Sequence, residues 1–124
     1  MSAYAIAQMR EIHPHLEVLE YLERIQATLN PFSGRFVVHG GAIEVLEGAW
    51  PGVLVIIEFP GMAEARSWYG SQAYQQILPL RTNHILGDAI LVEGVEPGHD
   101  SAQMASDLRA ANWVPASAAA ASPL

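Results

Sequence analysis

The sequence predicts an α+β protein of the ferredoxin-like class, in which four antiparallel strands and two helices follow one another as β-α-β-β-α-β. Three observations lead to this prediction. Two runs rich in Val, Ile, Leu and Phe, separated by Pro-Gly, fill residues 35–60. An amphipathic stretch with helical spacing precedes them, and a shorter helical stretch and a last apolar run follow them. Both helices are expected on one side of the sheet.

The first strand is expected over residues 4–10 (YAIAQMR). A helix is expected to begin at His13-Pro14, because proline suits the first turn of a helix, and to end at Asn30-Pro31. Apolar residues three and four positions apart define its buried side, and charged residues take the opposite side. The apolar set comprises Val18, Leu19, Leu22, Ile25 and Leu29, and the charged set comprises Glu17, Glu20, Glu23 and Arg24.

The centre of the chain, residues 35–60, is expected to form two long strands joined by a turn at residues 49–52. With that turn, opposite residues have numbers that sum to about 100. One face is then purely apolar, and the other combines apolar residues with two carboxylates. The first face pairs Val45 with Val55 and Ile43 with Ile57, and the second holds Ala42, Glu44, Leu46, Leu54, Ile56 and Glu58. Gly40-Gly41 is expected to mark a bulge, which leaves the face of His39 open.

A short second helix is expected over residues 61–70, followed by one or two turns that Ser71 caps and Pro79 disturbs. The last strand is expected over residues 88–94 (DAILVEG), with Asp88 after Gly87 as a turn residue. The sequence thus predicts a domain over residues 1–96. Residues 97–124 are expected to form a C-terminal extension, with a short helix over residues 101–112 and then a mobile, low-complexity tail.

The second face of the central strands suggests how the protein assembles. Helices on only one side of a sheet leave its other apolar side uncovered. The simplest way to cover it is a second copy of the same sheet, so a homodimer through this face is expected.

Composition excludes several classes of function. The chain has no cysteine, which excludes disulfides and thiolate zinc sites. Thirteen acidic residues face six basic residues, all of them arginine, so nucleic acid and anionic membranes are not expected partners. No signal peptide or membrane span is apparent, and a cytoplasmic location is expected. Nucleotide-binding and serine-hydrolase motifs are missing, so no cofactor is predicted.

Several segments resemble, at their spacing, the domain-of-unknown-function family 1330. They are HGGAIEVLEGAW, VIIEFP, SWYGSQAY, and Arg81 followed by GDAILVEG, and the resemblance covers residues 3 to about 95. It implies a dimeric α+β barrel in which two ferredoxin-like sheets face each other. This architecture is similar to that of small cofactor-free monooxygenases, lactone isomerases and dimeric stress-responsive proteins. The family has no established reaction, so the resemblance assigns no catalytic residue.

Three residues are candidates for catalysis: His39, Glu58 and Arg81. His39 beside two glycines could be a general base or a ligand donor, although a histidine bonded to a neighbouring carboxylate or carbonyl is favoured. Glu44 and Glu58, if adjacent, could split their pKa values, although ion pairs with Arg35, Arg81 or Arg10 at the dimer seam are favoured. Arg81 could hold a ligand carboxylate, or equally Asp88 or a helix end.

The expected ligand-binding residues are His39, Trp68, Tyr69, Tyr74 and Arg81. The aromatic three are mostly core by their spacing, yet they would also suit a flat or aromatic ligand in a cleft between sheet and helix. His13-Pro14-His15 looks like a metal pair, but its histidines do not share a helix face and no third ligand is nearby, so no metal is predicted.

The sequence leaves two functions open and does not decide whether the protein is an enzyme. In the first, the protein binds a small, mostly apolar or aromatic molecule in the sheet-helix cleft, or acts on it without a cofactor. In the second, it is a non-catalytic dimeric interaction or stress-related module that uses its tail as a contact. An enclosed cavity that touches both His39 and Arg81 favours the first function, and a filled, dry core favours the second.

Overall fold

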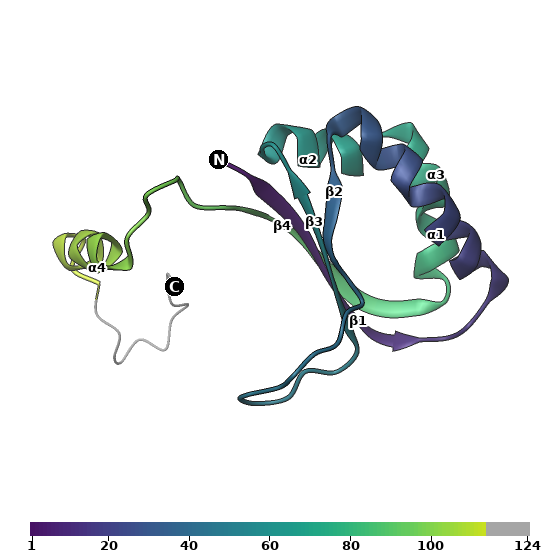
Figure 1. Cartoon of the computed structure of the whole chain (residues 1–124), viewed down its shortest axis with the longest axis horizontal. Coiled ribbons are helices and arrows are strands. Elements are labelled where there is room, and N and C mark those ends of the chain that lie inside the picture. The colour runs from purple at the N-terminus through teal and green to yellow at the C-terminus, as the bar shows by residue number, and fades with distance from the viewer. Residues whose placement is uncertain (114–124) are drawn as a thin grey trace.

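The computed structural model describes residues 1–113 of the chain. It confirms the ferredoxin-like order of elements, with a four-stranded antiparallel sheet in the order β2-β3-β1-β4 (Figure 1). The elements are β1 (Ala3–Ile12), α1 (Leu16–Leu29), the 3-10 turn η1 (Asn30–Phe32), β2 (Arg35–His39), β3 (Val53–Phe59), α2 (Met62–Tyr69), α3 (Gln72–Thr82), β4 (Ile85–Glu93) and α4 (Ser101–Ala110).

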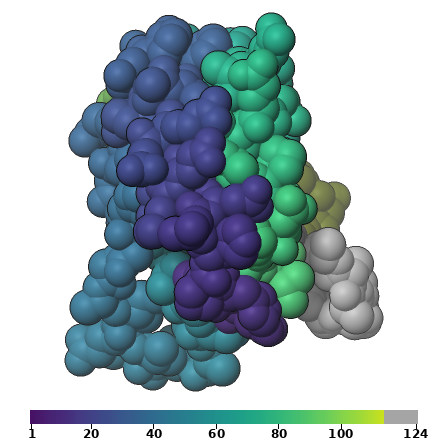
Figure 2. Space-filling model, turned by 90° about the vertical axis from the view of Figure 1, so that its right-hand side faces the viewer, coloured from purple at the N-terminus to yellow at the C-terminus, as the bar shows by residue number. Residues whose placement is uncertain are grey.

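The helices α1, α2 and α3 cover one face of the sheet, as predicted (Figure 1). On the outer surface of this layer α1 and α3 lie side by side (Figure 2). Aromatic and aliphatic side chains from the sheet and the three helices form the core between them. The buried core residues are Ala3, Tyr21, Ile25, Leu29, Ile57, Phe59, Ala65, Trp68, Tyr74 and Ile77.

Helix α1 begins three residues later than the sequence suggested. His15 caps it, because its Nδ1 accepts the backbone N–H of Glu17 at 3.0 Å. Ile25 and Leu29 are buried as expected, but Leu19 is 56% exposed and Leu22 is 45% exposed. The buried side of the helix is therefore rotated from the predicted stripe, since α1 packs against α3.

The central strands are much shorter than predicted. β2 ends at His39 and β3 begins at Val53, so residues 40–52 form a long connection that projects toward the side away from the helices (Figure 1). His39 pairs with Val55 and Phe36 pairs with Ile57, so the predicted pairings of residues 43 and 45 are wrong. The register shift lies between Phe36 and Val38, before the Gly-Gly pair.

Gly40 explains why β2 stops where it does. Its φ of +73° is in the left-handed region, which turns the chain out of the strand. Its N–H donates to the carbonyl of Leu54 at 2.9 Å, which is the last hydrogen bond of this part of the ladder. The alternating residues that follow therefore have no neighbouring strand to pair with.

The two faces of β3 agree with the prediction. Val55 and Ile57 point to the helices and pack in or against the core. Ile56 lies on the other face in register with Ile6, and Ile6 in turn lies opposite Ile90, which is 56% exposed. An apolar row thus crosses the uncovered side of the sheet.

The second half of the fold differs from the prediction in two places. Ser71 caps α3 as expected, but the helix continues through Pro79 to Thr82. β4 begins at Ile85, so Asp88 lies inside a strand, where it forms an ion pair with Arg10, and is not a turn residue.

The C-terminal segment forms the expected helix, α4, which stands away from the sheet (Figure 1). The predicted tail at residues 114–124 lies outside the described residues. Among residues 1–113, no helix is long and apolar enough to cross a membrane.

Candidate functional site

A cleft of about 600 Å³ lies between the sheet and the helices. Its floor is formed by the helix-facing side chains of β1, β3 and β4, and its walls come from α1, α2, α3 and the end of β2. The lining is mostly apolar. Representative lining residues are Met9, Val18, Leu22, Ile25, Phe36, Val53, Val55, Ile85 and Leu91.

Small residues in the floor explain why this space is not filled. Ala7 of β1 lies opposite Ala89 of β4 and Val55 of β3, and Ala5 is two residues away on the same face. All four line the cleft. Alanine side chains do not reach from the sheet to the helices, so the floor is low in the middle of the layer.

All five predicted ligand-binding residues line this cleft: His39, Trp68, Tyr69, Tyr74 and Arg81. Trp68 and Tyr74 are 3% and 2% exposed, whereas Tyr69 is 40% exposed. Their rings form one cluster, with centroids of Trp68 and Tyr74 4.2 Å apart and those of Tyr69 and Tyr74 5.5 Å apart. Trp68 and Tyr74 are therefore part of the core, as predicted, and all three rings line the cleft.

His39 lies on the helix-facing side of the sheet. The shifted register after Phe36 places it there, and the two rings stack with centroids 4.0 Å apart and an angle of 2° between their planes. Within residues 1–113 no hydrogen bond or ion pair engages the imidazole, so the favoured interpretation of a histidine held by a carboxylate or carbonyl is not what the structure shows. The ring lines the cleft with its nitrogens available to a ligand.

A polar group of three residues lies in the otherwise apolar cleft. The hydroxyls of Tyr21 and Tyr74 are 2.8 Å apart, and Arg81 Nη2 donates to the Tyr74 hydroxyl at 3.5 Å. The guanidinium carbon of Arg81 also lies 5.6 Å from the centroid of the Tyr21 ring. Arg81 is only 8% exposed, and its Nε has no hydrogen-bond partner among the described residues.

The protonation states of this group follow from burial and proximity. Burial raises the pKa of the Tyr21 hydroxyl far above its usual range, and Tyr74 adds to the shift. Burial lowers the pKa of the Arg81 guanidinium while Tyr74 and Tyr21 raise it, with a net upward shift. Near neutral pH the Arg81 guanidinium is therefore charged and the Tyr21 phenol is neutral.

Glu58 does not belong to this site. It lies on the uncovered face of the sheet, opposite Tyr4 of β1 and Arg35 of β2. Arg35 forms an ion pair with it at 2.5 Å and lowers the pKa of the Glu58 carboxyl. The predicted contact between Glu58 and Glu44 is wrong, because residue 44 lies in the connection between β2 and β3, whereas the ion pair with Arg35 is confirmed.

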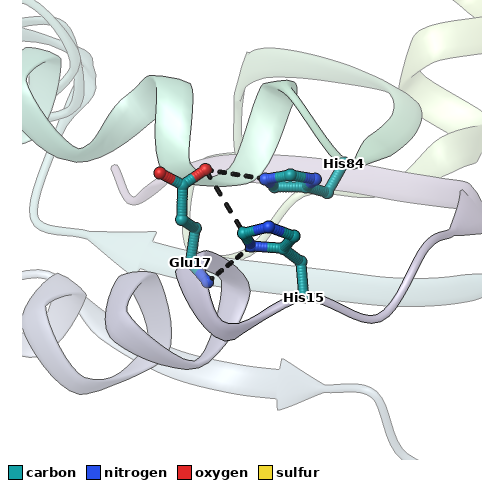
Figure 3. A network of polar contacts seen from close by, with 3 residues as sticks. All are labelled: His15, Glu17 and His84. Carbon is teal, nitrogen blue, oxygen red and sulfur yellow. Dashed lines mark hydrogen bonds and ion pairs between the residues drawn. The ribbon is translucent and has the colours of Figure 1, made fainter.

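A second polar cluster joins His15, Glu17 and His84 where α1 begins and α3 ends (Figure 3). Glu17 Oε1 lies 2.7 Å from His84 Nε2, and the two imidazole rings stack with centroids 3.8 Å apart. No local pattern identifies His84 as a partner of His15, because the two lie far apart in the chain. His13, the other histidine of the predicted pair, contacts Glu11 instead, at 2.9 Å.

The cluster connects the beginning of α1 to the end of α3, and its geometry does not suit a metal centre. Its three ligand atoms lie within 4.8 Å of one another, but a metal must lie in the plane of each imidazole that binds it. The planes here are nearly parallel, at 11°, and stacked on each other. The His15 Nδ1 is also engaged by the N–H of Glu17.

Tyr21 is the main site residue that sequence reasoning missed. The predicted apolar stripe includes Val18, Leu22 and Ile25, and Tyr21 lies between them on the same side of α1. Its position three residues after Val18 and four before Ile25 was the available signal.

Comparison with solved structures supports the fold. A protein of unknown function from Rhodopseudomonas palustris is similar over 77% of this chain and 84% of its own, with a TM-score of 0.61 and 14% sequence identity. SnoaB, a cofactor-independent oxygenase from Streptomyces nogalater, is similar over 77% of this chain and 94% of its own, with a TM-score of 0.54 and 9% identity. At such low identity the similarity shows the fold alone.

No curated protein matches this chain. The family model of a domain of unknown function, DUF1330, matches residues 2–95, which include every residue of the cleft. This chain therefore belongs to the DUF1330 family.

Proposed function

We propose that this protein binds a small, mostly apolar or aromatic molecule in the sheet-helix cleft, either to carry it or to act on it without a cofactor. The observation that carries the proposal is the cleft itself, whose volume of about 600 Å³ is in the range of ligand sites and whose lining includes both His39 and Arg81. In such a site, a small number of polar groups within the apolar lining fixes the orientation of the ligand.

The aromatic wall supports a flat ligand. Trp68, Tyr69 and Tyr74 present connected rings to the cleft, and Phe36 with its stacked His39 adds a second aromatic surface. Rings of this kind favour offset or edge contacts with another π system. In the enzymatic form of the proposal His39 is the general base, since an imidazole is the side chain best suited to proton transfer and its ring lines the cleft.

The oxygenase SnoaB gives the enzymatic form a precedent at the level of the fold. A cofactor-independent oxygenase works on a similar arrangement of sheet and helices, which supports the proposal by analogy only. The chemistry must come from the residues of this chain.

We further propose that the protein works as a homodimer through the uncovered sheet face. Ile6, Ile56 and Ile90 form an apolar row there, and an uncovered apolar face of this kind marks an interaction surface. The same face carries the Arg35–Glu58 ion pair, which a two-fold partner would cover.

Filling the cleft tests the proposed function. N-phenyl-1-naphthylamine is a neutral apolar dye whose fluorescence rises on transfer from water to an apolar site. We expect saturable binding to the native protein and at least about tenfold weaker binding to Ala7→Phe, because the new ring occupies the space above the floor. Ala102→Phe is the matched control, since it adds the same ring to the exposed surface of α4 and should bind as the native protein does.

Equal dye binding by the native protein and a folded Ala7→Phe variant would contradict the proposal. The non-catalytic interaction module would then be the better description. Its proposed contact, the tail, lies outside the described residues.

A further inference from the structure

We propose, building on the function above, that the ligand of the cleft is an anion, a carboxylate on an apolar or aromatic body, and that Arg81 binds the carboxylate with help from Tyr21. The inference starts from the buried charge of Arg81. The residue is 8% exposed, and burying a guanidinium without a counter-charge is costly.

In the described part of the chain no carboxylate compensates this charge. No aspartate or glutamate is among the cleft-lining residues of the segment 1–113. Arg10, Arg24 and Arg35 each pair with an acid, namely Asp88, Glu20 and Glu58, although all three are far more exposed than Arg81. The most buried of these arginines is thus the one left without a carboxylate.

The hydrogen bonds of Arg81 are incomplete as well. Among residues 1–113 its Nε has no partner, and the side-chain hydrogen bond found there, from Nη2 to Tyr74, is long at 3.5 Å. A guanidinium offers its N–H groups as a planar fork that fits the two oxygens of a carboxylate. The Nε edge of the Arg81 guanidinium therefore lacks a carboxylate partner among the described residues.

The two phenols add a further donor. Between Tyr21 and Tyr74 one hydroxyl donates and the other accepts, so one of the two O–H protons has no acceptor among residues 1–113. The Tyr74 oxygen also accepts from Arg81. If Tyr74 donates to Tyr21, the Tyr21 O–H is free to donate to a ligand oxygen. A cation and a spare O–H donor next to each other call for an acceptor that carries negative charge.

The rest of the cleft defines the body of the ligand. Beyond this polar group and His39, its floor and walls are mostly alanine, aliphatic and aromatic side chains. The overall charge of −7 opposes the approach of an anion, so attraction of the whole protein for anions cannot mimic the effect. A preference for a carboxylate must come from the cleft itself.

The test compares two ligands of nearly the same shape, 2-naphthoate and its neutral amide, 2-naphthamide, by calorimetry at pH 7. The native protein is expected to bind the carboxylate at least about tenfold more tightly than the amide, as a charge-assisted hydrogen-bond pair requires. In Arg81→Met this preference should disappear, while affinity for the amide changes less than about threefold. Because the pair is buried, the preference should persist in 0.5 M NaCl.

A second variant keeps the test decisive if Arg81→Met does not fold. Arg81→Lys retains the charge without the planar fork, so it should still prefer the carboxylate, but by a smaller factor than the native protein. Equal affinity of the native protein for both ligands would overturn the proposal, as would a preference that survives intact in Arg81→Met. Binding of the amide that Ala7→Phe abolishes would leave the cleft function standing even then, which separates the two failures.

Discussion

The indole Nε1 of Trp68 donates a hydrogen bond to Thr28 Oγ1 at 3.0 Å, and this bond ties α2 to α1 in the interior. Thr28 in turn donates to the carbonyl of Ile25 at 2.7 Å, so its hydroxyl both accepts and donates a hydrogen bond. Both residues are buried. The bond holds the tryptophan that forms one wall of the cleft.

Thr28→Val is expected to lower the free energy of unfolding by about 1–3 kcal/mol, because it leaves the buried indole N–H without an acceptor while keeping the shape of the side chain. Thr28→Ser keeps the hydroxyl and should cost less. Urea denaturation followed by circular dichroism measures both. A Thr28→Val protein as stable as the native one would mean that the bond makes no net contribution to the free energy of unfolding.

Gly52 is expected to be the least replaceable residue of the connection between β2 and β3. Its φ is +84°, and a Cβ there would collide with the carbonyl of Met9. Gly48 has a similar φ of +73°, but a Cβ there would meet no atom within 4 Å. Comparing substitutions at Gly52 and Gly48 therefore separates the cost of steric collision from the cost of backbone strain.

Gly52→Ala should therefore destabilise the protein by at least about 2 kcal/mol more than Gly48→Ala, whose cost is about 1 kcal/mol of backbone strain. Thermal unfolding of both variants under the same buffer conditions measures the difference. Similar losses in the two variants would show that the strand end moves to make room for the methyl group.

The fold could be predicted from the sequence because its signals are local. Helical spacing in α1 and apolar runs in β3 and β4 identify the elements, and their order fixes the class. The long hairpin could not be predicted correctly, because residues 41–46 alternate like a strand. Only the left-handed Gly40 and the shifted pairing of His39 with Val55 show that no strand lies beside them.

The site was predicted in part for a similar reason. His39, Trp68, Tyr69, Tyr74 and Arg81 carry polar or aromatic groups that attract notice, and the cleft contains all of them. The residues that make room for a ligand are instead small and apolar. The floor of the cleft is low because the residues around Ala7 and Ala89 are small. They come together through the pairing of β1 with β4, which no local pattern in the sequence reveals.

Protonation of Glu58 is expected to make stability depend on acid pH. Arg35 lowers the pKa of this carboxyl below its usual value of 4.5 in the folded protein. The ionised form is thus favoured by folding, and its contribution is present above pH 4.5 and lost as the pH falls through the folded pKa. Glu58→Gln removes that contribution at every pH.

The difference in stability between the native protein and Glu58→Gln should consequently be largest near neutral pH and shrink below pH 4.5. Urea denaturation at a series of pH values between 3 and 7 measures it. Glu20→Gln serves as the control, because the Glu20–Arg24 pair lies on an exposed helix surface where ion pairs contribute little. A constant difference across the series would argue against the role of Arg35.

Ile56→Asp is expected to convert the protein from a dimer to a folded monomer. The side chain lies in the middle of the apolar row on the uncovered face, between Val38 and Ile6 in the sheet. A carboxylate there would meet its own copy or apolar groups across a two-fold interface, and burying it unpaired is costly. Leu19→Asp is the control, since it places the same charge on the exposed side of α1.

Light scattering during size-exclusion chromatography at micromolar concentration measures the mass directly against the 13.4 kDa of one chain. The native protein and Leu19→Asp should have twice that mass, and Ile56→Asp should have the mass of one chain with an unchanged circular dichroism spectrum. A folded Ile56→Asp dimer would place the interface elsewhere. A native monomer would mean that Ile6, Ile56 and Ile90 face water, and the uncovered sheet would then need a different partner.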